Sequence, residues 1–299
     1  MTILATLAGA GLIVLTLGDI FEVLFNPLGR GRVSRVLVKL LWRVFRHLSR
    51  QRHSLLELAG PLALISVIGT WLTLLVIGWA LIYWPHLPDE FLLTAKPNTS
   101  SAASLAEALY LSMTTITTLG YGDITPTSEW LRIVTPLEAI FGFGLLTASL
   151  SWVISVYQVL RRRRSLALEI ALLREEQSAI DLNVAKMEPF AAQELLSGLS
   201  SQLNNVWNDM LQFPITYYFA SSDRQSALSV GMPYLLLLAQ EGASTSCTPE
   251  VRLRAAMLLG KIHTFTLLLT ANFINLSPTT AAREVLEAYA HDHLHAVPA

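Results

Sequence analysis

The sequence predicts an all-α membrane protein with a mostly helical, soluble C-terminal part. Of the 299 residues, 53% are hydrophobic and only 14% are charged, which is too apolar a composition for an ordinary soluble protein. Three apolar segments are long enough to cross a bilayer as helices, and helical periodicity continues beyond Ser165. The single cysteine, Cys247, excludes an intrachain disulfide and fits a reducing compartment for the C-terminal part.

Residues 3–25 are almost wholly apolar and predict a first membrane-spanning helix. No basic stretch precedes them, and Asp19 and Glu22 stand where a signal peptide has small residues for cleavage, so a retained helix is favoured over a cleaved one. Because a charge deep in a bilayer is costly, we expect both acids near the cytoplasmic end or against other parts of the protein. The simpler alternative is an interfacial pair near Arg30 and Arg32.

The next segment predicts a basic amphipathic helix that lies on the membrane surface. Between Val33 and Leu48 the apolar residues recur with helical periodicity. The basic residues on the other face are Arg35, Lys39, Arg43 and Arg46. Such a helix binds in the headgroup layer with its cations toward anionic lipids. Arginines at this spacing also occur in voltage sensors, but a sensor needs more surrounding helices than the one that precedes this segment.

Two further membrane spans, residues 62–84 and 131–160, flank a shorter apolar segment. Prolines end the first of them, and Arg161 to Arg164 end the second. Residues 104–117 have the length and polarity of a short re-entrant helix. Its C-terminal end carries the negative end of the helix dipole, which favours a cation nearby.

The basic residues indicate how the chain is oriented. Residues 26–59 carry eight Lys or Arg and the four arginines follow the last span, whereas residues 85–130 carry only Lys96. Loops rich in Lys and Arg stay on the cytoplasmic side. We therefore expect the N-terminus outside the cell and the C-terminal part in the cytoplasm.

The most specific stretch of the sequence is TTITTLGYGD, residues 114–123, which we call the filter stretch. Gly120 and Gly122 flank Tyr121, and alternating glycines let successive carbonyls point the same way, because glycine adopts backbone conformations denied to other residues. Such a strand can line a narrow hole with oxygens. One loop supplies one carbonyl per level, whereas a dehydrated cation needs a full shell, so several copies must surround a common axis.

The filter stretch resembles the selectivity filter of potassium channels, in which four loops surround the ion. The resemblance covers residues 60–160 and implies a tetrameric pore of outer helix, pore helix with filter, and inner helix. It implies that K⁺ binds backbone carbonyls of Thr118, Leu119, Gly120 and Tyr121, with Gly122 completing the ion-binding loop. It also implies passive conduction rather than an enzyme, with no cofactor other than potassium ions.

The resemblance assigns roles to the residues around this loop. Tyr121 packs its ring behind the filter, Asp123 lies at the outer mouth, and Thr117 supports the loop. Thr114 stands where better-known bacterial channels often carry an acid. An inactivation mechanism that relies on that acid is therefore in doubt, although conduction is not.

Several residues of the third span are candidates for a gate. Gly142 stands where many potassium channels have a hinge glycine, although close packing is an equal alternative and Gly144 is equally available. The residues expected to line the cavity or lower gate are Leu146, Leu150 and Ser151. Glu138 is an acid in mid-span, and it either forms a structural hydrogen bond with the pore helix or acts in ion attraction or filter gating.

The C-terminal part predicts a helical cytoplasmic domain for regulation or assembly. The elements expected in it are a stripe of Leu166, Ile170 and Leu173, a helix over 189–211, a buried strand or loop over 213–219, a helix over 222–240, helix starts at Thr248-Pro249 and Ser277-Pro278, and a core helix over 258–276 rather than a fourth span. We expect His263 to be a hydrogen-bonded core residue. His291, His293 and His295 are expected to be solvated rather than a metal site.

These inferences divide the chain into four segments: residues 1–28 (transmembrane), 29–59 (interfacial), 60–160 (pore) and 161–299 (cytoplasmic). The expected function is a homotetrameric potassium channel of the plasma membrane, or of the inner membrane in a bacterium, gated through its cytoplasmic domain. The expected partners are anionic lipids, further copies of the chain and an unidentified cytoplasmic ligand, but no nucleic acid. The alternatives are a less selective cation channel and a membrane-anchored signalling protein whose tail is the active part.

Overall fold

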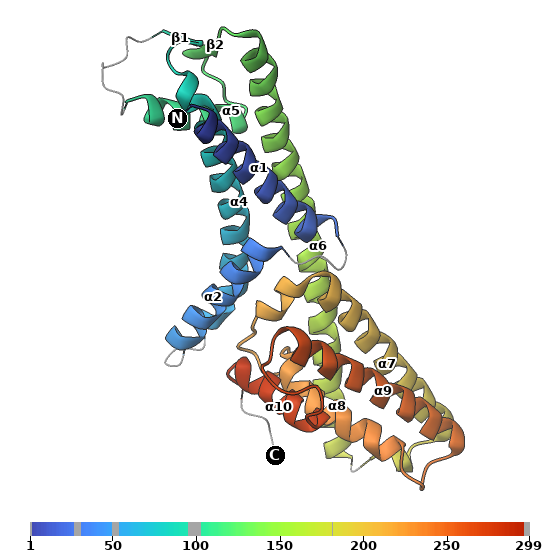
Figure 1. The fold of residues 1–299 in the computed structure, drawn as a ribbon. Helices are drawn as coiled ribbons and strands as arrows, with labels where there is room; N and C mark the ends of the chain where they lie inside the picture. Colours follow the sequence, from blue (N-terminus) through green and yellow to red (C-terminus); the bar gives the residue numbers. More distant parts are fainter. Residues whose placement is uncertain (1, 27–30, 50–53, 95–102, 181, 296–299) are drawn as a thin grey trace. The chain divides into compact units, whose positions relative to one another are not determined.

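The computed structural model describes residues 2–26, 31–49, 54–94, 103–180 and 182–295, which are mostly helical (Figure 1). Three helical stretches are long and apolar enough to cross a membrane: Thr2–Leu24, Leu55–His86 and Glu129–Ala179. The three predicted spans are therefore confirmed. Asp19 and Glu22 lie in the first of them, whereas Arg30, their expected neighbour, falls outside the described residues.

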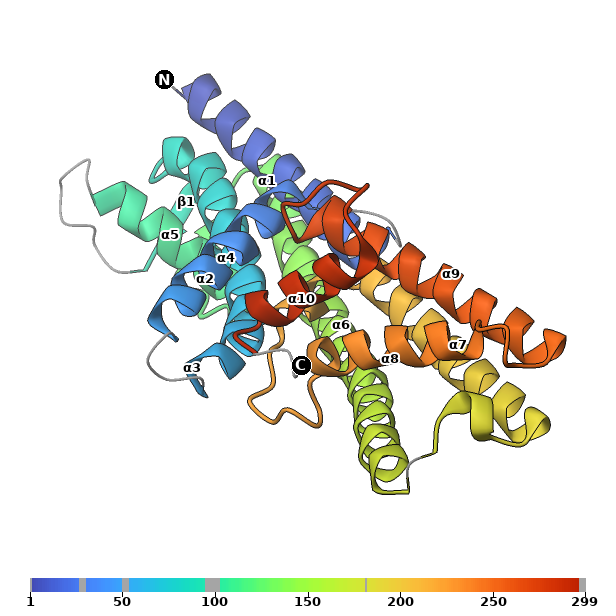
Figure 2. The same cartoon turned by 90° about the horizontal axis from the view of Figure 1, so that it is seen from below.

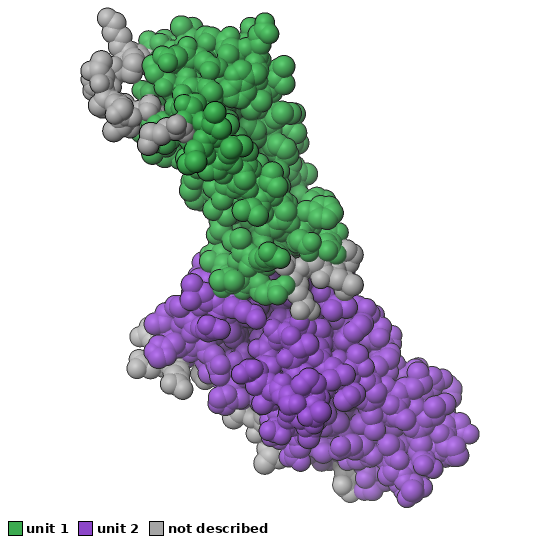
Figure 3. Space-filling view, viewed as in Figure 1, with its two compact units in different colours: residues 1–37, 64–154 green, residues 38–63, 155–299 purple. Residues whose placement is uncertain are grey.

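The chain divides into two compact units, which do not follow the expected segment boundaries (Figure 3). Unit 1 comprises residues 1–37 and 64–154, and unit 2 comprises residues 38–63 and 155–299. The basic amphipathic helix is thus shared between the units, because its second half packs with the C-terminal part. The first turn of the second span also belongs to unit 2.

Unit 1 contains the parts expected of a pore. Its elements are α1 (Thr2–Leu24), the first turns of α2 (Arg32–Leu48), most of α4 (Ala59–Tyr83), η1 (Trp84–His86), β1 (Phe91–Leu93), α5 (Ala103–Ile116), β2 (Ile124–Pro126) and the first half of α6 (Glu129–Ala179). Helix α5 matches the predicted re-entrant helix. The strands β1 and β2 form an antiparallel pair with Leu92 opposite Thr125.

Two glycines allow α1 and α4 to approach closely. A Cβ atom on Gly9 would lie 2.4 Å from the carbonyl oxygen of Gly78, and a Cβ on Gly78 would lie 2.7 Å from the Cγ1 of Ile13. Small residues at such a crossing let two membrane helices pack backbone to backbone. The extra N-terminal helix is therefore a packed part of unit 1.

Helix α6 is longer than the predicted third span. It runs without a break over 51 residues, through Pro136 and the four arginines. Leu166 and Ile170 of the predicted stripe are almost fully buried, since they pack within unit 2. The buried residues of the stripe therefore pack against other parts of unit 2 in the same chain.

Unit 2 is a helical bundle built around three long helices. Its elements are α3 (Ser54–Glu57), η2 (Val184–Lys186), α7 (Pro189–Gln212), η3 (Pro214–Tyr218), α8 (Leu228–Gly242), α9 (Pro249–Asn272) and α10 (Ala282–Asp292), together with the second halves of α2 and α6. Helices α7 and α9 lie side by side in both views (Figures 1 and 2). Leu258, Ile262 and Phe265 of α9 are fully buried, which confirms a core helix and not a fourth span.

Some local expectations for unit 2 were wrong. Residues 215–219 are buried as expected, but residues 214–218 form the 3₁₀ helix η3 where a strand or a loop was expected, and α8 begins at Leu228, later than expected. The helix expected to start at Ser277-Pro278 begins at Ala282. The Ser277 hydroxyl instead accepts from the backbone N–H of Thr279 at 3.3 Å, in a turn. Short polar side chains stabilise such turns as readily as helix caps.

Three of the four histidines singled out in the sequence were also predicted wrongly, whereas His291 is exposed, as expected. His263 is exposed, because α9 buries positions 258, 262 and 265 and position 263 falls on the opposite side. His293 and His295 are buried, not solvated. Among the described residues, no group of three or more His, Cys, Asp or Glu side chains is arranged to hold a metal ion.

Candidate ion-conduction site

The backbone of the filter stretch alternates between two conformations. Thr118, Gly120 and Gly122 have positive φ angles of 59°, 47° and 78°, whereas Leu119 and Tyr121 between them do not. The sequence identified the two glycine positions. The sequence pattern gave no signal for Thr118. This residue is β-branched, so a left-handed conformation costs it of order 1–3 kcal/mol, and residues strained in this way are typical of functional sites.

The end of α5 fixes the start of this loop. The backbone N–H of Thr118 donates to the carbonyl of Thr115 at 2.9 Å, and those of Leu119 and Gly120 donate to the carbonyl of Thr114 at 2.9 and 3.1 Å. Within the described part of the chain, no backbone N–H donates to the carbonyls of residues 118–121. These oxygens are therefore left for another ligand.

The aromatic and acidic residues of the filter stretch are held by α5. The rings of Tyr121 and Tyr110 stack with centroids 6.4 Å apart and planes 4° apart. The hydroxyl of Tyr110 donates to the Oδ2 of Asp123 at 2.8 Å, and the Thr117 hydroxyl donates to the carbonyl of Met113 at 2.7 Å. The predicted packing of Tyr121 against the pore helix is present, and Tyr110 is a support that the sequence analysis missed.

One chain leaves this loop uncovered. Leu119 and Tyr121 are 56% and 67% exposed, and a Cβ atom on Gly120 or Gly122 would meet nothing within 4 Å. Leu146 and Leu150 of α6 are 68% and 62% exposed. In a single chain, both the loop of the filter stretch and this apolar face of α6 are therefore exposed.

Glu138 lies buried between three helices of unit 1. The hydroxyl of Tyr83 in α4 donates to its Oε2 at 2.7 Å, and the hydroxyl of Ser112 in α5 donates to its Oε1 at 2.5 Å. The Ser112 oxygen also lies 3.1 Å from the carbonyl of Val76. The geometry favours the structural hydrogen bond with the pore helix over the role in ion attraction.

Replacing Glu138 with leucine should lower the melting temperature of the detergent-solubilised chain. Leucine removes the acceptor of the buried Tyr83 hydroxyl, which costs about 1–3 kcal/mol, whereas the Ser112 hydroxyl can still donate to the carbonyl of Val76. Glu138→Gln keeps an acceptor oxygen, so its melting temperature should lie between those of the wild type and of Glu138→Leu. Glu129→Gln, at the exposed start of α6, is the matched control. A Glu138→Leu chain as stable as wild type but with altered ion selectivity would instead support a role in ion attraction.

Gly142 allows α6 to touch the end of α5. A Cβ at this position would lie 1.9 Å from the carbonyl oxygen of Ile116, whereas a Cβ on Gly144 would meet nothing within 4 Å. This contact gives Gly142 a packing role, and its role as a hinge stays a prediction. Ser151 is exposed, and its hydroxyl donates to the carbonyl of Thr147 at 3.2 Å.

Asp19 joins three helices of unit 1. It is 6% exposed and accepts from the backbone N–H groups of Val33 and Ser34 at 2.9 and 3.3 Å, from the Ser34 hydroxyl at 2.5 Å and from the Trp71 Nε1 at 2.9 Å. A carboxylate at a helix N-terminus satisfies free N–H groups and the helix dipole. Asp19 therefore faces protein, at the start of the helix that Arg32 opens.

Glu22 has a different environment, and a glycine makes the Asp19 contact possible. The Oε2 of Glu22 accepts from the Asn26 Nδ2 at 3.1 Å.

A Cβ on Gly31 would lie 2.6 Å from the Oδ1 of Asp19, so glycine lets the start of α2 approach the carboxylate. The sequence signal for this site was the unexplained acid within an apolar helix.

The second half of α2 is attached to the C-terminal part within unit 2. The Nε1 of Trp42 donates to the Oδ2 of Asp292 at 3.0 Å, and the Nη1 of Arg46 lies 2.8 Å from the Oδ1 of Asp292. Arg46 was expected to face lipid and instead forms an ion pair with α10. Arg35, Lys39 and Arg43 are exposed, as is an apolar stripe of Val33, Val36, Leu40, Val44 and Leu48.

His293 lies next to this attachment, enclosed by aromatic rings. Its ring centroid is 5.2 Å from that of Trp42, 4.9 Å from that of Tyr217 and 4.8 Å from that of Tyr289. Its Nε2 lies 2.8 Å from the carbonyl oxygen of Tyr217. Burial lowers the pKa of His293 from 6.5 to about 4, against the opposing charge of Asp292.

Unit 2 should therefore lose stability as the pH falls from about 6.5 towards 4. In this window the unfolded chain takes up a proton at His293 that the folded chain does not bind, so the free energy of unfolding decreases. Thermal melts of the full chain at a series of pH values measure this loss. His293→Gln should flatten the dependence in this window, and His263→Gln, at an exposed position, should not. Equal slopes in all three chains would contradict the assignment.

Comparison with known proteins identifies the pore part of this chain. Residues 66–159 match the family model described as ion channel, and they include most of α4, all of α5, the filter stretch and the first part of α6. The membrane protein YdjJ of Bacillus subtilis, described as uncharacterized, is 30% identical over 232 residues, which are 76% of this chain and 66% of that protein. The chain therefore carries an ion channel domain and is a membrane protein.

Shorter matches lie in potassium channels. The calcium-gated potassium channel TvoK of Thermoplasma volcanium is 38% identical over 68 residues, which are 23% of this chain and 19% of that protein. The two-pore potassium channel 5 of Arabidopsis thaliana is 41% identical over 51 residues, or 17% of this chain and 12% of that protein. The chain thus covers less than two thirds of the length of each of these relatives. No solved structure matches the chain.

Proposed function

We propose that this protein is a potassium-selective channel that conducts K⁺ passively as a homotetramer. The observation that carries the proposal is the loop at 118–122, where positive φ angles alternate and the carbonyls accept no backbone hydrogen bond from the described residues. Carbonyls that take the place of an ion's hydration shell are the basis of potassium selectivity. The relatives named as potassium channels support the choice of ion.

The open surfaces of one chain support the proposed tetramer. Four copies around an axis would complete a ring of oxygens at each level of the filter stretch, and they would cover the exposed side chains of Leu146 and Leu150. The sites proposed for K⁺ are the carbonyls of Thr118, Leu119, Gly120 and Tyr121. The uneven distribution of basic residues supports a cytoplasmic location for unit 2, from which it would control the gate.

Ion flux in liposomes tests the function directly. The purified full-length chain should release K⁺ from loaded liposomes far faster than Na⁺, with release driven only by the ion gradient. Equal K⁺ and Na⁺ flux would favour the less selective cation channel. An assembled protein that conducts neither ion would favour the membrane-anchored signalling protein.

Charge on α2 should contribute to binding of anionic lipids. Replacing Arg35, Lys39 and Arg43 together with glutamine should weaken the dependence of channel activity on anionic lipid content, since each basic residue near an anionic surface contributes about 1 kcal/mol. Flux in liposomes with increasing phosphatidylglycerol measures the response. The control replaces Arg252 and Arg254, two exposed arginines of α9. An unchanged response in the α2 variant would refute the lipid role.

A further inference from the structure

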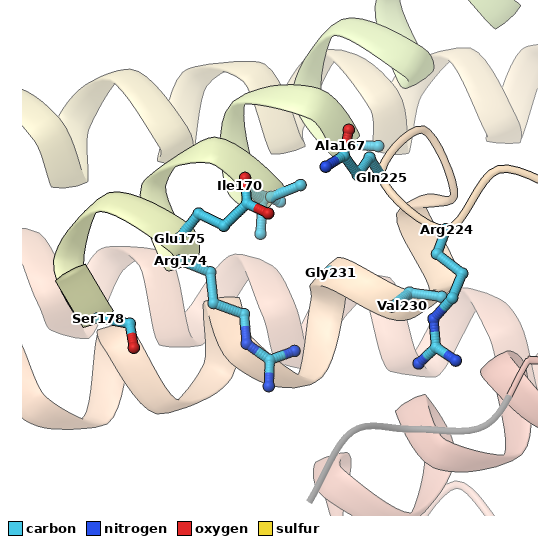
Figure 4. A pocket seen from close by; sticks show the side chains of 10 residues that line it. Ala167, Ile170, Arg174, Glu175, Ser178, Arg224, Gln225, Val230 and Gly231 are labelled. Atoms are coloured by element: carbon cyan, nitrogen blue, oxygen red, sulfur yellow. The ribbon is translucent and has the colours of Figure 1, made fainter.

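Unit 2 contains an open cavity between the C-terminal part of α6 and the start of α8. Its volume is about 390 Å³, and Figure 4 shows the side chains that line it. Its apolar lining, which we call the floor, is made of the buried residues Ala167, Ile170 and Val230. A Cβ atom on Gly231 would lie 3.0 Å from the Cγ2 of Ile170, so this glycine lets α8 approach α6 at the base of the cavity.

Two arginines from separate segments line this cavity. Arg174 comes from α6 and Arg224 from the loop that precedes α8, and in Figure 4 both guanidinium groups lie away from Ile170 and Gln225. The guanidinium of Arg174 lies over the ring of Tyr234 at 5.9 Å. A cation over an aromatic ring is attracted by the negative face of the ring, and a guanidinium can also pair with the oxygens of an anion.

The end of α8 at this cavity adds to the positive potential. The N-cap residue of α8 is Ala227, and no side chain caps the helix there. Val230 and Gly231, in its first turn, line the cavity. The N-terminus of a helix favours an anion because its first N–H groups and its dipole both point outward.

The cavity also offers groups for an uncharged part of a ligand. Glu175 and Gln225 line it, and a carboxylate accepts from hydroxyl or amino groups. In Figure 4 the carboxylate of Glu175 lies on the side of Ile170, away from the guanidinium of Arg174. The cavity therefore combines a cationic side, an apolar floor and a side of hydrogen-bond acceptors.

We propose that this cavity binds a small organic phosphate monoester whose body carries hydroxyl or amino groups, with the phosphate between Arg174 and Arg224. Arginine is suited to this because its planar fork pairs with phosphate oxygens bidentately. Resting on the proposed channel function, such a ligand would control the gate, because the helix that carries Arg174 is α6, the proposed inner helix of the pore.

Binding of adenosine monophosphate to the detergent-solubilised full-length chain tests the site. The nucleotide should bind saturably, and inorganic phosphate should compete with it. Arg174→Gln and Arg224→Gln should each weaken binding by about tenfold, as expected for the loss of one charge-assisted contact. Arg174→Lys keeps the charge but loses the planar guanidinium, so its affinity for the nucleotide should lie between those of the wild type and of Arg174→Gln. Arg254→Gln, at an exposed position of α9, should bind as the wild type does.

Two further ligands test whether the phosphate is needed for binding and whether it belongs to a free monoester or to a lipid. Adenosine should not bind, because it lacks the phosphate. Short-chain phosphatidic acid offers the same phosphate group on a lipid, and binding of this lipid in place of the nucleotide would overturn the proposal of a free monoester. Equal nucleotide binding by the wild type and both glutamine variants would also overturn it, as would the absence of binding to the wild type at millimolar nucleotide.

Flux measurements distinguish this site from the channel function. Nucleotide binding that depends on both arginines, in a protein without potassium flux, would overturn the proposed function and support the site. Potassium flux in a protein whose arginines do not affect nucleotide binding would overturn the site and support the function.

Discussion

Replacing Gly120 with alanine should abolish potassium flux and leave the protein largely assembled. Gly120 has a φ angle of 47°, and a left-handed conformation costs an L-residue with a Cβ about 1–2 kcal/mol. In a tetramer this cost applies four times around one ring of carbonyls. Because a Cβ there would meet nothing within 4 Å in its own chain, the expected defect lies in the backbone of the filter stretch and not in the packing of unit 1.

The comparison needs a glycine whose replacement should be harmless. Gly11→Ala serves, because Gly11 lies within α1 and a Cβ at this position meets nothing within 4 Å. Potassium and sodium release from liposomes is measured for both variants, and crosslinking in detergent gives their oligomeric state. Wild-type preference for potassium in the Gly120→Ala protein would count decisively against the filter assignment.

The spans and the filter stretch were predictable because their signals are local. A run of about 20 apolar residues predicts a membrane helix whatever lies around it, and glycines at alternate positions predict positive φ angles at those positions. The same reasoning could not find Thr118. Threonine disfavours this conformation, and the bonds from Leu119 and Gly120 to the carbonyl of Thr114 depend on how the end of α5 is placed.

The partners of the buried charges were not predictable from local pattern. Asp19 binds the start of α2 and Trp71 of α4, and Trp42 binds Asp292, 250 positions away. Helical periodicity shows which side of a helix is apolar but not which helix packs on it. For this reason Arg46, on a basic face typical of lipid contact, was assigned to lipid although it pairs with Asp292.

Long-range packing also determines how the chain divides into its two compact units. Residues 38–63 were assigned to an interfacial segment and the start of the pore, yet they pack in unit 2. A Cβ on Gly60 would lie 2.4 Å from the ring of Phe219, and Glu57 accepts from the backbone N–H of Ser222 at 2.8 Å. The apolar pattern of these residues is equally compatible with contact to lipid and with contact to protein. Only the residues that pack against them decide between the two.

The same packing determines what removal of the C-terminal part should do. A chain that ends at Arg164 loses Asp292, which accepts from Trp42, and Phe219, against which Gly60 packs. Burying a large apolar side chain stabilises a fold by about 1.5–3 kcal/mol, so the loss extends to α2 and the start of α4. We therefore expect much less folded tetramer from the truncated chain than from the full chain.

Trp42→Ala in the full-length chain separates assembly from control, because it weakens this attachment and keeps the C-terminal part. The substitution should destabilise unit 2 by about 3–5 kcal/mol and shift the open probability of channels that still assemble. Leu40→Ala is the matched control, since Leu40 lies on the same helix but is 56% exposed. Size-exclusion chromatography in detergent and single-channel recording measure the two effects. Normal assembly and wild-type gating in both the truncated and the Trp42→Ala channels would refute a role of unit 2 in assembly and a role in gating. The function of unit 2 would then lie outside the pore.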